Sequence, residues 1–120
     1  MSGIALFEDD ELMRSLLTEW LMAAGYPVRA IEPATVQNDR SADLVIVDLY
    51  MPRHQGVGRL RSARNAHPGA PIIAMSGQFR PGLRCAGPAA EALGVDRVIA
   101  KPFDREALLD TVRSVIGPPG

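Results

Sequence analysis

Short apolar runs alternate along this chain with longer segments whose apolar residues have helical spacing. Residues 4–7 are all apolar and end in Glu8-Asp9-Asp10, a pattern that predicts a buried strand opening into a loop. Asp10 is then expected to cap a helix over residues 11–24, which Gly25 ends. The apolar positions of this helix are Leu12, Leu16, Leu17, Trp20, Leu21 and Ala24.

The rest of the chain continues the alternation. The strongest strand prediction is residues 43–49, where a purely apolar run lies between two acids. Three further strands are expected at residues 26–31, 71–75 and 97–100. Helices are expected at residues 36–40 (brief), at 57–66, in an Ala-rich stretch ending at Leu93, and after a cap at Asp104. Residues 76–88 are rich in Gly and Pro and are expected to form a loop. Strands that are apolar throughout and alternate with helices predict an α/β fold with a parallel sheet covered on both faces.

Composition and charge narrow the class of protein. The chain has 120 residues, 47% of them hydrophobic and 22% charged, which fits one domain over residues 1–120, expected to have no output domain. The net charge of −1 argues against nucleic acid as the main partner. The single Cys85 cannot form an internal disulfide, and no apolar run approaches the roughly 18 residues of a membrane span. No cationic signal region is present at the start, so we expect a cytoplasmic protein that does not use a membrane.

Polar residues follow four of the predicted strands. They are Glu8 and Asp9 after the first, Asp48 at the third, Ser76 after the fourth and Lys101 after the fifth. Because the carboxyl ends of parallel strands open into one crevice, we expect these side chains to meet there. Three carboxylates in one pocket repel one another unless a cation lies among them, and carboxylate oxygens with water suit Mg²⁺. A hydroxyl and an ammonium group added to this set allow a phosphoryl group to be transferred onto a carboxylate.

Lys101 differs from all the other basic residues of the chain. Of thirteen Lys and Arg residues, Lys101 is the one lysine. A lysine ends in a compact, rotatable ammonium, whereas an arginine ends in a planar fork. A narrow pocket that needs a point charge therefore favours lysine, although chance alone also places a lone lysine somewhere.

These motifs together resemble the response-regulator receiver domain of two-component signalling, of the chemotaxis-receiver type. The resemblance covers the whole chain and is carried by Phe7-Glu8-Asp9-Asp10, by Asp48-Leu49-Tyr50-Met51-Pro52 with Gly56, by Met75-Ser76-Gly77, and by Gly94 through Lys101-Pro102-Phe103. It implies a flavodoxin-like, doubly wound sheet of five parallel strands in the order 2-1-3-4-5, with helices on both faces.

The resemblance also implies a role for each site residue. Asp48 would be the phosphoacceptor, taking a phosphoryl group from a phosphohistidine on a histidine kinase or a histidine phosphotransfer protein. Mg²⁺ would be held by Asp9, Asp48, Glu8 through water, and the Tyr50 backbone carbonyl. Ser76, Gly77 and Lys101 would bind the phosphoryl oxygens, with the Lys101–Pro102 bond in the cis form. Such a protein is not an enzyme on other substrates: it catalyses its own phosphorylation and a dephosphorylation that Tyr50 is expected to keep slow, and it signals to a downstream protein.

The chain departs from the family pattern in the expected switch region. Val98 stands three residues before Lys101, where the family usually has an aromatic residue. The Gly- and Pro-rich segment after Ser76 is longer than usual, and Phe79 is its nearest aromatic residue. We therefore hypothesise that residues 77–88 form the switching element, with Ser76, Phe79 and Val98 as the switch region.

Other interpretations of these residues stay open from the sequence. Asp48 could cap a turn before Pro52, and Ser76-Gly77 could be an ordinary turn. At the level of function, the chain could be a degenerate receiver that acts as a docking module without phosphorylation. A small phosphatase with an aspartyl nucleophile is disfavoured, because such enzymes resemble this site but carry a second acid where this chain has Tyr50.

Overall fold

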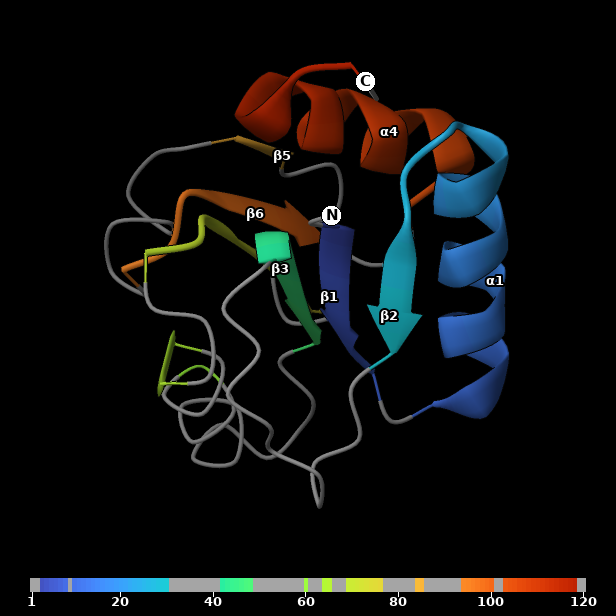
Figure 1. Cartoon of the computed structure of the whole chain (residues 1–120), viewed down its shortest axis with the longest axis horizontal. Helices are drawn as coiled ribbons and strands as arrows, with labels where there is room; N and C mark the ends of the chain where they lie inside the picture. Colours follow the sequence, from blue (N-terminus) through green and yellow to red (C-terminus); the bar gives the residue numbers. More distant parts are fainter. Residues whose placement is uncertain are drawn as a thin grey trace.

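The computed structural model describes residues 3–8, 10–30, 42–48, 60, 64–65, 69–76, 84–85, 94–100 and 103–118. For residues 29, 30, 76, 84 and 85 only the backbone is described. Two helices and six strands are assigned in this part of the chain (Figure 1). The helices predicted at residues 36–40 and before Leu93 lie outside the described residues. Of the helix predicted at 57–66, Leu60, Arg64 and Asn65 are described, and all are helical.

The strands form one sheet in the order β2-β1-β3-β4-β6-β5. Their bounds are Gly3–Phe7 (β1), Val28–Ala30 (β2), Ala42–Asp48 (β3), Ile72–Ser76 (β4), Arg84–Cys85 (β5) and Arg97–Ala100 (β6). All neighbours among the first five strands in this order pair in parallel, which confirms the predicted order 2-1-3-4-5.

The sheet has one strand more than expected. β5 lies within the segment predicted to be a loop, and it pairs antiparallel with β6, Arg84 opposite Ile99 and Cys85 opposite Val98. The prediction of five strands, all parallel, was incomplete here. A two-residue strand has no periodicity that a sequence can reveal, and its pairing depends on the free edge that β6 offers.

Alternate residues of the strands face two separate parts of the core. Ile4 and Leu6 of β1 and Leu44 and Ile46 of β3 pack with the two helices in one cluster of buried residues. The intervening residues, such as Val45, belong to a second cluster that includes Leu60. This two-residue alternation shows that the sheet is covered on both faces, as predicted.

The first helix, α1 (Glu11–Ala23), begins at the predicted cap. The Asp10 carboxylate accepts hydrogen bonds from the backbone N–H groups of Leu12 (3.0 Å) and Met13 (3.2 Å). The buried face of α1 is narrower than the face predicted from the apolar spacing, because Leu12 is 84% exposed and Leu16 is 38% exposed. The face that packs on the sheet is centred instead on Leu17 and Leu21, both fully buried.

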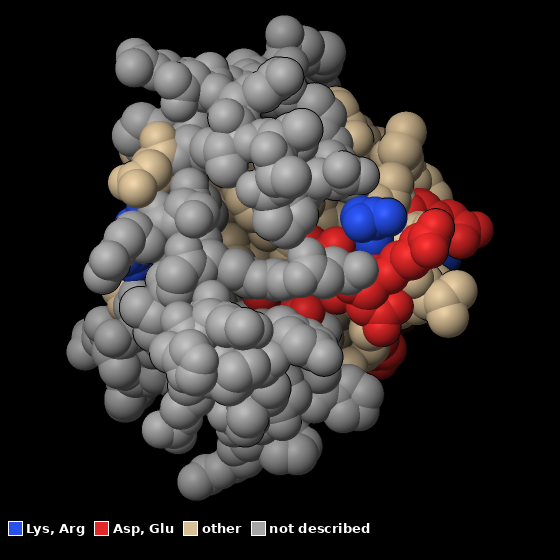
Figure 2. Space-filling model, turned by 90° about the horizontal axis from the view of Figure 1, so that it is seen from below, with Lys and Arg blue, Asp and Glu red and all other residues tan. Residues whose placement is uncertain are grey.

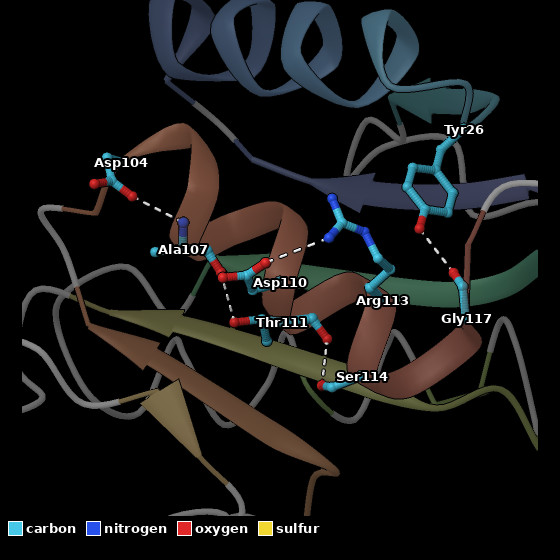
Figure 3. A network of polar contacts seen from close by, with 8 residues as sticks. All are labelled: Tyr26, Asp104, Ala107, Asp110, Thr111, Arg113, Ser114 and Gly117. Carbon is cyan, nitrogen blue, oxygen red and sulfur yellow. Dashed lines mark hydrogen bonds and ion pairs between the residues drawn. The ribbon is translucent and has the colours of Figure 1, made fainter.

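The last helix, α4 (Arg105–Ile116), is joined to the turn after α1. Asp104 caps its start by accepting from the Ala107 N–H at 2.8 Å, as predicted (Figure 3). At its end, the buried Tyr26 hydroxyl donates to the Gly117 carbonyl at 2.7 Å. Gly117 has a φ of 78°, which a glycine adopts without strain. The hydrogen bond therefore holds the residue that follows α4 against the α1–β2 turn.

Candidate functional site at the carboxyl ends of the strands

The strand register brings the predicted acids together. In the parallel pairing of β1 with β3, Phe7 is opposite Val47, and the next residues along the two strands are Glu8 and Asp48. Asp48 is in turn opposite Met75 of β4, the residue before Ser76. Since β1, β3 and β4 are parallel neighbours, these three positions lie at one end of the sheet.

Glu8 and Asp48 are both almost completely buried, each with 2% of its surface exposed. They are the only buried Asp or Glu residues in the part of the chain that the structure describes. Burying a carboxylate is unfavourable unless hydrogen bonds or an opposite charge compensate for the lost water. Two buried acids on adjacent strands therefore mark an edge of the sheet that can accommodate a cation, in addition to the interactions that both residues already make.

The loop between β1 and α1 orders the acidic side of this site. The Asp10 backbone N–H donates to Glu8 Oε1 at 3.0 Å, which fixes the Glu8 side chain. The Arg14 guanidinium donates to the Glu8 backbone carbonyl at 3.4 Å. Figure 2, which looks at this end of the molecule, shows acidic side chains gathered over one region with a basic group against them. Sequence reasoning did not single out Arg14, although an arginine in the first turn of a helix that follows four consecutive acids, residues 8–11, is a signal that the sequence offers.

Several predicted site residues fall outside the described residues: Asp9, Tyr50, Gly77, Phe79, Lys101 and Pro102. For Ser76 the backbone alone is described, and it pairs with Ala100, the residue before Lys101 in the sequence. Val98 is fully buried and is paired with Ala74 of β4 and Cys85 of β5. Among the described residues, no three acidic, His or Cys side chains form a group able to hold a metal.

The donor chemistry nevertheless fits a hard divalent cation. Glu8 and Asp48 supply carboxylate oxygens, which Mg²⁺ and Ca²⁺ prefer over nitrogen or sulfur. Asp48 Oδ2 is buried and accepts no hydrogen bond within the described part of the chain, while other interactions engage this residue. Two carboxylates with waters form a partial coordination shell, and Mg²⁺ commonly keeps several waters of its own.

Neither α1 nor α4 is long and apolar enough to cross a bilayer.

The sequence matches the Response regulator receiver domain family over residues 4–113. It is 31% identical over 119 residues to the transcriptional regulatory protein CpxR of Escherichia coli strain K12, a match covering 97% of this chain and 50% of CpxR. The chain therefore spans about half the length of this curated relative.

Solved structures also resemble the chain in fold. The chemotaxis protein CheY4 of Vibrio cholerae is 25% identical, with a TM-score of 0.72 and coverage of 96% of this chain and 98% of CheY4. A response regulator from Burkholderia pseudomallei has the same fold, with 21% identity and a TM-score of 0.69. The match covers 92% of this chain and 66% of that one, whose structure was solved with a phosphorylated aspartic acid, calcium and citrate. A family match over nearly the whole chain, a curated relative above 30% identity and the shared sheet order agree: the chain belongs to the response regulator receiver domain family.

Proposed function

We propose that this receiver domain accepts a phosphoryl group on Asp48 from a phosphohistidine donor. The observation that carries the proposal is the burial of Asp48 beside the Glu8 position, at the carboxyl end of the central strand β3. In α/β folds with parallel sheets, ligands bind at this edge. A carboxylate held there by a rigid strand is well placed for in-line attack, because positioning contributes much of the rate in phosphoryl transfer.

The reaction forms one bond and breaks one. A carboxylate oxygen of Asp48 attacks the donor's phosphorus, a P–O bond forms, and the P–N bond to the donor imidazole breaks. The imidazole leaves with the bonding electron pair. A ring that was protonated on its other nitrogen is released as neutral imidazole, and a ring that was not takes up a proton as it leaves. The product is an aspartyl phosphate, whose phosphoryl group carries about −1.5 to −2 charges at neutral pH.

The residues around Asp48 are proposed to share that charge. A bound Mg²⁺ supplies electrostatic stabilisation of the phosphoryl oxygens. Asp9, Glu8, Asp48 and the Tyr50 carbonyl are proposed to hold this ion, directly or through water. Ser76, Gly77 and Lys101 are proposed to bind the phosphoryl oxygens, with Lys101 contributing a point charge.

The exposed part of α1 is proposed to meet the donor protein. Leu12 is 84% exposed and lies two residues after Asp10, at the start of α1 beside the acidic loop. Leu16, one turn further, is also exposed. A protein that delivers a phosphohistidine to Asp48 covers the surroundings of the site, and two exposed leucines on one helix side offer it apolar contact. Leu12→Asp is expected to slow transfer from a histidine phosphotransfer protein while leaving transfer from acetyl phosphate unchanged.

The phosphorylated state is proposed to act through protein contacts in the cytoplasm. Residues 77–88 remain the proposed switching element, and their described portion, β5, contacts both β6 and α4. We further propose that the receiver acts as a stand-alone domain. The match with CheY4, over 98% of that chain, favours this, whereas CpxR is matched over 50% of its length.

The experiment is an intact-mass measurement after incubation with Mg²⁺ and acetyl phosphate. A gain of about 80 Da, one phosphoryl group, is expected for the native protein and for Asp43→Asn, an exposed acid on the same strand. Asp48→Asn should show no gain, and Lys101→Arg should show a reduced one. Native protein that stays unmodified under these conditions, and also with a phosphohistidine protein, would contradict the proposal and favour the docking module. Repeated release of phosphate from small phosphate esters would favour the phosphatase.

A further inference from the structure

Arg14 occupies a position where a helix does not favour a cation. It lies in the first turn of α1, where its backbone N–H donates to the Asp10 carbonyl at 2.8 Å. The helix dipole makes this end partially positive, so a positive side chain here is disfavoured by about 0.3–1 kcal/mol. The acidic residues just before it in the sequence, Glu8 to Glu11, offset this cost.

The side chain of Arg14 points back toward the acidic loop. Side chains on a helix lean toward its amino terminus, and the Nη1 atom of Arg14 lies 3.4 Å from the Glu8 backbone carbonyl. Arg14 is half-buried, and Glu8 is 2% exposed. The guanidinium therefore stands at the rim of the buried acids.

The geometry of this contact separates the charge of Arg14 from the carboxylates. The hydrogen bond goes to the carbonyl of Glu8, while Glu8 Oε1 is engaged by the Asp10 N–H. The guanidinium adds positive potential to the site without using that carboxylate oxygen as its acceptor. A divalent cation entering the site meets this potential as a repulsion, which falls off with distance and salt.

We propose that Arg14 is a positioning residue that holds the β1–α1 loop and also weakens divalent-cation binding, so that the ion exchanges readily. This inference rests on the proposed function, which places the ion beside Glu8 and Asp48. Without the cation, the buried acids still interact favourably with a nearby positive charge, so Arg14 stabilises the metal-free state.

The test is a binding titration with Mn²⁺, followed by electron paramagnetic resonance of the free ion, which needs no phosphorylation. Arg14→Gln should bind Mn²⁺ on the order of threefold to tenfold more tightly, as expected for one unit charge removed near a partly solvated site. Arg14→Lys, which keeps the charge, should stay within about twofold of the native protein. Arg113→Gln, on α4, is the matched control, with the same change of net charge at an exposed residue that pairs with Asp110.

The results separate a failure of the inference about Arg14 from a failure of the proposed metal site. Tighter binding by Arg14→Gln alone, with the difference shrinking as salt is raised, supports the inference. Equal or weaker binding by Arg14→Gln, or an equal change in Arg14→Lys, overturns it while leaving the proposed function intact. Native protein that binds no Mn²⁺ overturns the proposed metal site, and the inference with it.

Discussion

Replacing Asp48 by Asn is expected to stabilise the metal-free protein, even though it removes the proposed phosphoacceptor. Asp48 and Glu8 are both 2% exposed and occupy corresponding ends of adjacent strands. Neighbouring strands are about 4.8 Å apart, and we take roughly 6 Å as an order-of-magnitude separation of the two carboxylates. At an effective dielectric constant near 20, two like charges at that distance repel by about 3 kcal/mol.

Asn keeps the shape of Asp and one acceptor oxygen, so most of the packing at position 48 is retained. Allowing for hydrogen bonds that the carboxylate makes better than an amide, we expect a net gain of about 1–3 kcal/mol in the free energy of unfolding. For a domain of this size the gain corresponds to a rise in melting temperature of roughly 3–10 °C.

The assay is thermal and urea unfolding in EDTA and in Mg²⁺. The native protein should gain about 1.4 kcal/mol at an Mg²⁺ concentration ten times its dissociation constant, whereas Asp48→Asn should gain little. Asp43→Asn, exposed on the same strand, should match the native protein in both conditions. The reasoning is refuted if Asp48→Asn is less stable than the native protein in EDTA, or if Mg²⁺ stabilises both equally.

Three further predictions concern the stability of the helices and the core around the site, and each is a change in the free energy of unfolding measured with urea. Tyr26→Phe removes the 2.7 Å hydrogen bond to the carbonyl after α4 and should lower the free energy of unfolding by about 1 kcal/mol; no loss would mean that water replaces the bond. Asp104→Ala removes the cap of α4 and should lower the free energy of unfolding by about 0.5–2 kcal/mol. Asp110→Ala breaks an exposed ion pair with Arg113 and should lower it by well under about 1 kcal/mol; equal losses would contradict the capping role. Leu17→Ala should cost about 2–5 kcal/mol and Leu12→Ala under about 0.5 kcal/mol, because the first is fully buried and the second 84% exposed; the reverse order would show that the wrong face of α1 has been assigned to the core.

The features that local signals specify could be predicted from the sequence. The cap residues Asp10 and Asp104 sit where the helices begin, and β6 has the predicted bounds. The parallel strand order could be predicted because apolar runs separated by helices allow few arrangements, and the family resemblance selects among them. The placement of Glu8 and Asp48 at one edge follows from that order.

The features that tertiary context decides could not be predicted. Leu12 and Leu16 satisfy helical spacing, yet the sheet contacts only a narrow stripe of α1, and spacing does not say where the stripe is centred. Tyr26 was expected to begin β2, which starts instead at Val28, and its hydroxyl bonds a residue 91 positions away. Arg14 was passed over because an arginine on a helix is ordinary until its acceptor is known.

The antiparallel strand β5 has a consequence for how these molecules behave at high concentration. Val98, Ile99 and Ala100 of β6 are buried and apolar, and a strand of that kind at an open edge is a template for pairing with another chain. β5 occupies the outer side of β6, so the protein's own backbone takes the hydrogen bonds that a neighbour would use. At the opposite edge, the described part of β2 is short, spanning Val28–Ala30. The pairing of β6 with β5 and the shortness of β2 thus both disfavour edge-to-edge aggregation.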